Sequence, residues 1–228
     1  MIEDPPLLQI RRRFDRPSAA QVQAFAGLQT GFVIDAMNGR GALDRHVKPI
    51  AGSAPFCGAA LPCFCGPDDN LAAFGALSIA QPGDVVVAAA EGFDRSAVIG
   101  DLMLGMMKNV GVTAFVTDGC VRDQRGLKAV GLPCYAAGVT PNSPVRNGPG
   151  TVGLPVVVGG VAVKAGDIVL GDEDGVVVVP SERIEAVIAR IEVVRRNEVA
   201  FEAKVKAGLK LPDFIQKLID AGRFLDVD

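Results

Sequence analysis

Between residues 84 and 136 the sequence alternates short apolar runs with amphipathic segments, and no other feature constrains the fold as strongly. The runs "DVVVAAA", "TAFVTD" and "PCYAAG" have the composition of buried strands. Between them, "RSAVIGDLMLGMMKNVG" and "QRGLKAVG" have helical periodicity, and Gly111 is placed to cap the first helix. Because parallel strands need a long crossover, this order predicts an α/β fold with a central parallel sheet.

The segments on either side of this region predict further elements. Ser18 and Gln21 stand at capping-box spacing before an apolar helical pattern, and a second short helix is expected from Gly31 to Met37. After Gly138, β-branched runs are separated by the turn signals "GG", "AGD" and "DEDG", so the C-terminal half is expected to be β-rich.

From Ser181 onward the sequence is again helical through "ERIEAVIARIEVVRRNEVAFEAKVKAG". We therefore expect two parts. Residues 1–180 form a single α/β catalytic domain with N-terminal helices. Residues 181–228 form a helical extension that packs on a neighbouring subunit.

Composition excludes several classes of protein. The 228 residues are 49% hydrophobic and 21% charged, which is enough to bury a sizeable core. The net charge is -3 and the only basic cluster is the short Arg11–Arg13 run, so no nucleic-acid partner is expected. The N-terminus is not that of a signal peptide and no apolar run reaches membrane-spanning length, so we expect a cytoplasmic protein without a membrane partner.

Cysteine and histidine content limits the available chemistry. Five cysteines without an export signal indicate reduced thiols. Cys63 and Cys65 in "CFC" suggest half of a soft-metal site, but the second half is missing. His46 is the only histidine, so acid/base work must use carboxylates, a lysine or metal-bound water.

The run "GPGTVG", from Gly148 to Gly153, fits the spacing of a dinucleotide-binding loop. It follows a Pro/Asn/Ser-rich segment and enters a β-branched run, whereas the fingerprint requires a strand before it and a helix after it. We interpret it as a turn. A methyltransferase is disfavoured for the same reason, since no glycine-rich cofactor loop leads into a helix.

The strongest functional signal is the polar end of "TAFVTDGCVRDQRG". Asp118, Gly119, Arg122 and Asp123 follow one strand, and Asp101 follows the loop after the neighbouring one. Ligands of open α/β sheets bind beyond the carboxyl ends of the strands, so Asp101 and Asp123 are expected to face one cavity. Arg122 suits a carboxylate and Asp123 a divalent cation. The alternative is that Arg122 and Asp123 form a surface ion pair and that Asp118 and Gly119 form a simple turn. Charged residues at two adjacent strand ends favour a ligand-binding site instead.

The elements "GDLMLGMMKNVGVTAFVTDGCVRD" and "LPVVVGGVAVKAGDIVLGDEDGVVVVP" resemble one known family. It joins the 4-hydroxy-4-methyl-2-oxoglutarate aldolases, which also decarboxylate oxaloacetate, to the regulator of ribonuclease E activity A. The resemblance implies a swivelling β/β/α-type fold, homotrimers or homohexamers, and active sites between subunits. Members act in the degradation of aromatic acids.

The resemblance also implies roles for individual residues. Asp123 would hold Mg²⁺ or Mn²⁺ through one carboxylate and water. Arg122 would bind the keto-acid end of a small 2-oxo acid substrate. The loop that begins at Gly100 would complete the pyruvate pocket with the backbone N–H groups of Leu102 and Met103.

Three acidic residues would complete the site. Asp101 would lie beside the metal waters, and Asp35 and Glu198 would come from the neighbouring subunit. These residues imply a class II aldolase that forms pyruvate from a 4-hydroxy-2-oxo acid. The base that accepts the C4 hydroxyl proton would be Glu198, or Asp101 acting through water.

Three alternatives are weaker. Metal-free regulators of the ribonuclease E type lack the acid after the arginine, whereas Asp123 is present here. A phosphohistidine carrier needs an exposed histidine, and His46 lies outside the shared elements. A Schiff-base aldolase needs a lysine at an apolar strand end, but Lys108 and Lys128 lie in amphipathic helical stretches.

Overall fold

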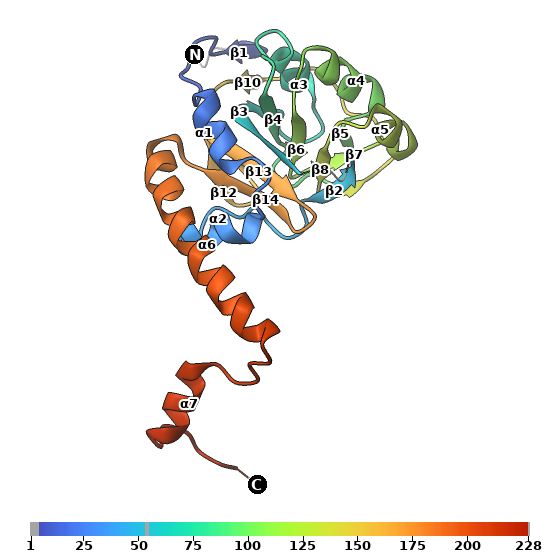
Figure 1. The fold of residues 1–228 in the computed structure, drawn as a ribbon. Helices are drawn as coiled ribbons and strands as arrows, with labels where there is room; N and C mark the ends of the chain where they lie inside the picture. The colour runs from blue at the N-terminus through green and yellow to red at the C-terminus, as the bar shows by residue number, and fades with distance from the viewer. Residues whose placement is uncertain (1–4, 53–54, 228) are drawn as a thin grey trace.

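A nine-stranded sheet runs through the molecule in the computed structural model, which describes residues 5–52 and 55–227 (Figure 1). The strands follow the order β1-β10-β3-β4-β6-β8-β2, and β13 and β14 join the sheet at β3. The bounds of these nine strands are β1 Leu8–Ile10, β2 Lys48–Ala51, β3 Phe56–Phe64, β4 Asp84–Ala89, β6 Ala114–Thr117, β8 Cys134–Ala136, β10 Gly150–Val152, β13 Ile168–Asp172 and β14 Gly175–Val179.

The centre of the sheet is parallel, which confirms the α/β prediction. Strands β3, β4, β6 and β8 pair in parallel, with Val86 opposite Phe115 in the β4–β6 ladder. The connections between them carry helices, as parallel pairing requires. These helices are α3 (Leu71–Ala76), α4 (Asp101–Asn109) and α5 (Gln124–Val130).

The two faces of the parallel strands belong to different cores. In β4, Val86 and Ala88 pack with the helices α3, α4 and α5, whereas Val85 and Val87 pack with the strands β11 and β12. This follows from the alternation of side chains along a strand. The strands β11 (Val156–Val158) and β12 (Val161–Val163) form a separate hairpin.

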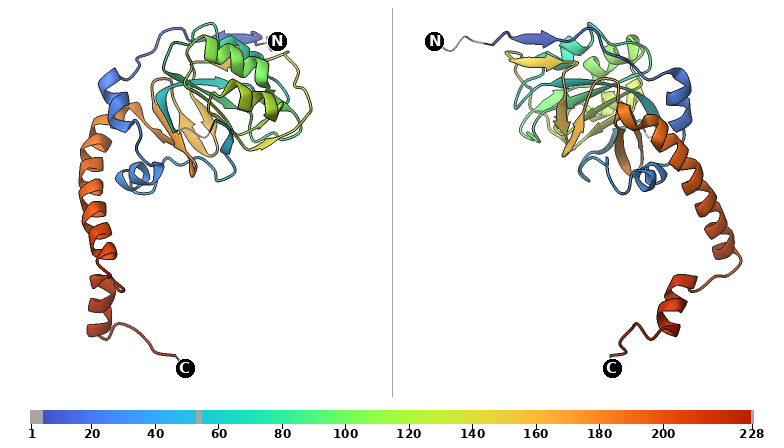
Figure 2. Two further views of the ribbon diagram at one scale, coloured as in Figure 1. Left: turned by 45° about the vertical axis from the view of Figure 1, so that its right-hand side comes forward. Right: turned by 90° about the vertical axis from the view of Figure 1, so that its left-hand side faces the viewer.

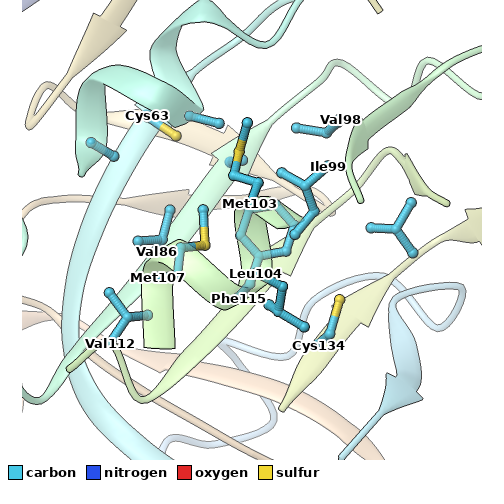
Figure 3. Packing of buried hydrophobic residues seen from close by; sticks show 14 of the residues in the cluster. Cys63, Val86, Val98, Ile99, Met103, Leu104, Met107, Val112, Phe115 and Cys134 are labelled. Carbon is cyan, nitrogen blue, oxygen red and sulfur yellow. The ribbon is translucent and has the colours of Figure 1, made fainter. Parts of the chain in front are cut away.

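Helix α4 is fixed to the sheet by its apolar face. Met103, Leu104 and Met107 are buried and point toward Phe115 and its neighbours on the sheet (Figure 3). Their spacing places them on one side of the helix. Gly111 follows the helix with φ of 83°, a left-handed conformation that suits glycine at a helix end, as predicted.

A further helical layer covers the outer face of the β13–β14 hairpin. It consists of α1 (Ala19–Phe25), α2 (Thr30–Ala36) and the start of α6 (Ile184–Lys206). Phe25, Val33 and Ile184 pack there with the hairpin residue Leu170. The predicted capping box at the start of α1 is present, because Ser18 and Gln21 bond each other's backbone N–H groups.

A small parallel sheet extends the molecule beside α4 and α5. It has the order β5-β7-β9, with β5 Ala97–Ile99, β7 Cys120–Val121 and β9 Gly138–Val139. In this sheet Ala97 pairs with Cys120 and Ile99 with Val121. The sequence pattern did not predict these strands, because each has only two or three residues.

The C-terminal helices leave the body as an arm (Figure 2). Ile184, Val187 and Ile191 at the start of α6 are buried in the chain's own core, so the extension is anchored to its own domain. Farther along α6 the side chains are mostly exposed, as are those of α7 (Asp213–Asp220). Exposed large apolar residues on the arm and after it are Val193, Val199, Phe201, Val205, Leu211, Phe214, Leu218, Ile219, Phe224, Leu225 and Val227. No helix in the described ranges is both long and apolar enough to cross a membrane.

The N-terminal segment is held to the start of β4 by an ion pair. Arg16 donates from Nε and Nη2 to the two carboxylate oxygens of Asp84, at 2.8 and 2.9 Å. The side chain of Asp84 is only 1% exposed. It also accepts a hydrogen bond from the backbone N–H of Gln81. Loss of the guanidinium would therefore leave a buried carboxylate without its counter-charge.

We predict that Arg16→Ala lowers the free energy of unfolding by about 3 kcal/mol, because the variant leaves the buried Asp84 carboxylate without a counter-charge. Arg13→Ala is the matched control, since Arg13 is exposed on the same segment, and it should change stability by less than about 0.5 kcal/mol. Urea unfolding at one fixed protein concentration measures both. Equal stability losses in the two variants would contradict a special role for the Arg16–Asp84 pair.

Candidate active site

A hollow of about 160 Å³ opens at the N-terminal end of α4. Its lining residues come from four separate segments of the chain, including the loops that follow β5 and β7. Both aspartates that the sequence predicted to share a cavity are in its lining. The lining residues are Asn70, Phe74, Val98, Ile99, Gly100, Asp101, Leu102, Met103, Met106, Arg122, Asp123, Pro144 and Arg146.

Gly100 lets the two key side chains approach the end of β5. A Cβ atom at this position would overlap Asp123 Oδ2 and would lie 3.2 Å from Cγ and Nε of Arg122. The φ angle of Gly100 is -123°, which any residue adopts, so the absence of a side chain matters here for space: a Cβ atom would push the Asp123 carboxylate aside. The carboxylate and the guanidinium pair at 3.3 Å.

Asp123 holds an unusual backbone conformation. Its φ and ψ angles of 61° and 42° lie in the left-handed region, which costs energy for a residue other than glycine. It is the residue that precedes α5, and its carboxylate is about half exposed. Arg122, next to it, is fixed from both ends: its backbone N–H donates to Ile99 O at 3.0 Å, and its Nη1 donates to Ser143 Oγ.

Asp101 reaches the same hollow from the first turn of α4. A Cβ atom on Gly126 of α5 would overlap the carboxylate of Asp101, so this glycine makes room for it. The carboxylate accepts a hydrogen bond of 2.8 Å from the backbone N–H of Leu102. The family resemblance implies that the backbone N–H groups of Leu102 and Met103 bind the substrate. In this structure the N–H of Leu102 is hydrogen-bonded to Asp101 instead. Met103 is largely buried in the core.

Sequence reasoning missed one wall of the hollow, formed by Asn70, Phe74 and Arg146. Asn70 is 4% exposed; its Nδ2 donates to Val98 O at 2.9 Å, whereas its Oδ1 has no hydrogen-bond partner among the described residues. The guanidinium carbon of Arg146 lies 5.3 Å from the centroid of the Phe74 ring. These residues are far from the "DGCVRD" element in sequence, and only the fold brings them there.

The buried carboxylate of Asp69 holds this wall in place. One oxygen accepts from the backbone N–H of Leu71, at 2.7 Å. The other accepts from the N–H groups of Asn147 and Gly148, at 2.6 and 2.9 Å. Asp69 thereby ties the start of α3 to the loop that carries Arg146.

Asp118, in the polar segment that drew attention in the sequence, lies outside this hollow. Its carboxylate accepts a hydrogen bond of 2.8 Å from the N–H of Ala90, so it joins the end of β6 to the end of β4. Burial raises its pKa. The N–H of Gly119 is not free either, because it donates to Thr117 Oγ1 at 3.0 Å. Asp118 and Gly119 therefore have a structural role. Arg122 and Asp123, later in the same segment, line the hollow.

Asp35 and Glu198 do not line the hollow of their own chain. Both are exposed, Asp35 on α2 and Glu198 on the arm, on the side of the body away from α4 and α5 (Figures 1 and 2). A site that contains them would need a second copy of the chain. No lysine lines the hollow, and Lys108 instead donates to Val130 O at 2.5 Å.

The donor set fits a cation that keeps water ligands. Within residues 5–52 and 55–227 no group of three His, Cys, Asp or Glu side chains could enclose a metal. The carboxylates of Asp101 and Asp123 nevertheless line one hollow, and Gly100 leaves space beside Asp123. Mg²⁺ and similar hard cations are commonly held by one or two carboxylates with several waters. Asp123, with Asp101 beside it, is therefore a suitable partial ligand set.

Comparisons with known proteins identify relatives of the chain. A protein of Halalkalibacterium halodurans, provisionally named 4-hydroxy-4-methyl-2-oxoglutarate aldolase, is 32% identical over 199 residues, covering 87% of this chain and 95% of its own. The crystal structure of RraAS2 from Streptomyces coelicolor, from the RNase ES inhibitor RraA protein family, is 25% identical with a TM-score of 0.74. The match covers 83% of this chain and all of that one.

Two further comparisons concern the fold and the family. The fold is also that of an uncharacterised protein from Pseudomonas syringae, with a TM-score of 0.77 at 22% identity over 87% of this chain and 93% of that one. The family model RraA-like, described as Aldolase/RraA, matches residues 30–178, which is more than half of the chain and includes every described segment that lines the hollow. The chain belongs to the RraA-like family of aldolases and RraA proteins.

Proposed function

We propose that the protein is a divalent-metal-dependent lyase that cleaves a 4-hydroxy-2-oxo acid, such as 4-hydroxy-4-methyl-2-oxoglutarate, to pyruvate. The observation that carries the proposal is the juxtaposition of Arg122, Asp123 and Asp101 in one hollow. The aldolase name of the Halalkalibacterium halodurans relative supports it. Oxaloacetate decarboxylation would use the same residues, because both reactions leave a pyruvate enolate.

Each side chain has a part in this chemistry. Asp123 would hold a divalent cation, which would supply a Lewis acid at the keto group. Arg122 adds a fixed positive charge where negative charge develops as the C–C bond breaks, and its hydrogen bond to Ser143 keeps it oriented. Asp101 is placed to orient water in the hollow. Gly100, Leu102 and Met103 form the wall against which the pyruvate half would lie.

Cleavage of a 4-hydroxy acid also needs a base for the hydroxyl proton. Glu198 of a neighbouring subunit, which would also contribute Asp35 to the site, is one candidate, and Asp101 acting through water is the other. Oxaloacetate has no such proton, so its decarboxylation needs no base. Comparing the rates of the two reactions in a variant therefore shows whether the substituted residue acts as the base or serves both reactions.

The arm supports an assembly in which sites lie between subunits. Its exposed apolar side chains, among them Val199, Phe201 and Phe214, need a partner surface to be removed from water. We propose that residues beyond the anchored start of α6 pack on a neighbouring copy in a homotrimer or homohexamer. That arrangement would carry Glu198 toward another chain's hollow.

A regulatory protein is the alternative function, favoured by the likeness to RraAS2 of the RNase ES inhibitor family. Such a protein would need neither Asp123 nor a cation for its activity. The Arg122–Asp123 pair at the mouth of a hollow supports the enzyme instead. Pyruvate release distinguishes the two.

Metal removal is the direct test. Protein treated with EDTA should lose pyruvate release from 4-hydroxy-4-methyl-2-oxoglutarate and from oxaloacetate, and added Mg²⁺ or Mn²⁺ should restore both, because one cation site serves both reactions. A coupled lactate dehydrogenase assay measures pyruvate. Full turnover by protein shown to be free of metal would refute the metal-dependent reaction, and no pyruvate under any condition would favour the regulatory alternative.

The space beside Gly100 gives a sharper prediction. Gly100→Ala should weaken Mn²⁺ binding about tenfold to a hundredfold, because the new methyl group displaces the carboxylate of Asp123. Gly105→Ala is the matched control: it lies in the same helix and its Cβ would meet nothing within 4 Å. Isothermal titration with Mn²⁺ measures both. Unchanged Mn²⁺ affinity in the Gly100 variant would remove Asp123 from the ligand role.

Glu198 and Asp123 should differ in their effects on the two reactions. Glu198→Ala should slow aldol cleavage by about a hundredfold or more and leave decarboxylation comparatively intact, because only cleavage needs the base. Asp123→Ala should abolish both. Glu192→Ala, which removes an exposed acid from the same helix, should leave both reactions unchanged. Equal loss of both activities in the Glu198 variant, at unchanged oligomeric state, would leave Asp101 as the base.

A further inference from the structure

The backbone of Asp123 is strained at the point where the chain enters the hollow. Its φ of 61° and ψ of 42° lie in the left-handed region, which is unfavourable for a residue with a Cβ atom. Within residues 5–52 and 55–227, four residues other than glycine have a positive φ, and Asp123 is the one of these that lines the hollow. The strain therefore coincides with the candidate site.

Asp123 also lacks a stabilising bond that its position offers. It is the N-cap of α5, and its carbonyl oxygen accepts a helical hydrogen bond of 2.9 Å from the N–H of Leu127. Aspartate is among the best N-cap residues when its backbone is extended, because its carboxylate then accepts from an N–H group in the first turn of the helix. In the left-handed conformation the side chain of Asp123 makes no such bond. The carboxylate is thus withheld from its own helix.

The surroundings of the carboxylate in the hollow compensate it poorly. It pairs with Arg122 Nε at 3.3 Å, but both side chains are partly exposed, and ion pairs in contact with water contribute little to stability. Asp101 lines the same hollow, and two carboxylates that share a hollow repel each other. The unliganded protein therefore gains little from the negative charge of Asp123.

Contacts on both sides of Asp123 enforce its conformation. The N–H of Arg122 donates to Ile99 O at 3.0 Å, which ties the preceding residue to β5. Leu127, which bonds the carbonyl of Asp123, is fully buried in the core. Asp123 connects these two fixed points, so its backbone cannot relax without breaking one of them.

We propose that the left-handed conformation of Asp123 is a device that keeps its carboxylate away from α5 and available to a ligand, at a cost to the stability of the unliganded protein. The ligand is the divalent cation of the proposed function, on which this part of the inference rests. Binding of the cation offsets the cost, because a ligand that binds only the folded state stabilises that state. Stability and function thus oppose each other at this residue.

Paired alanine and glycine variants measure the strain. At position 123 both remove the carboxylate, but only glycine adopts a φ of 61° without strain. In EDTA, Asp123→Gly should therefore melt about 2–4 °C above Asp123→Ala, and not below the unsubstituted protein. Lys128, exposed within α5, is the matched control: there Lys128→Ala should melt above Lys128→Gly, because glycine destabilises an ordinary helical position. Thermal unfolding at one protein concentration and one heating rate measures all four variants.

Mn²⁺ tests whether the carboxylate is held for a cation. Saturating Mn²⁺ should raise the melting temperature of the unsubstituted protein and of both Lys128 variants, and leave both Asp123 variants unchanged. An Asp123→Gly variant that melts below the unsubstituted protein, or no higher than Asp123→Ala, would overturn the inference. Equal responses to Mn²⁺ in the unsubstituted protein and the Asp123 variants would also overturn it. Either result alongside normal metal-dependent pyruvate release would leave the proposed function standing, whereas no response to Mn²⁺ and no pyruvate release would reject both.

Discussion

The pairing of β5 with β7 is the interaction on which the site depends. These strands are only three and two residues long, yet their register sets Ile99 opposite Val121 and leaves the next residues, Gly100 and Arg122, side by side. The hydrogen bond from Arg122 N–H to Ile99 O continues the ladder by one step. Since Gly100 has no Cβ, the Arg122 and Asp123 side chains can occupy the space beside it. The two charged residues of the loop after β7 thus pack directly against the loop after β5.

The core and the site use opposite parts of the same helix. The apolar face of α4 packs Met103, Leu104 and Met107 against the sheet (Figure 3). Its first turn presents Asp101 to the hollow. The packing keeps Asp101 from moving relative to β7, because the apolar face of α4 and Val121 of β7 belong to the same hydrophobic core. The second wall is held differently, through the buried Asp69 carboxylate and its backbone donors. Two independent supports therefore fix the acidic and the basic sides of one hollow.

The helical layer over the β13–β14 hairpin completes the core and does not contribute to the hollow. Helices α1, α2 and the start of α6 cover the β13–β14 hairpin and complete the chain's own core. Beyond Ile191 only the partly buried Val194 packs against this core, and the large apolar side chains Val193, Val199, Phe201 and Val205 are exposed. If they pack on another copy, as we propose, assembly and catalysis are coupled, because the same helix carries Glu198. Under this proposal a single chain would supply Arg122, Asp123 and Asp101, and its neighbour would supply Glu198.

The sequence by itself determined the parallel α/β centre, the capped α1 helix, the β-rich C-terminal half and the shared cavity of Asp101 and Asp123. These follow from periodicity and from strand ends, which are local properties. Only the tertiary structure separated Asp118, which ties two strands together, from Arg122 and Asp123, which line the hollow. It alone brought Asn70 and Arg146 to the same hollow, because contacts between distant segments depend on register and loop path, which no local pattern encodes.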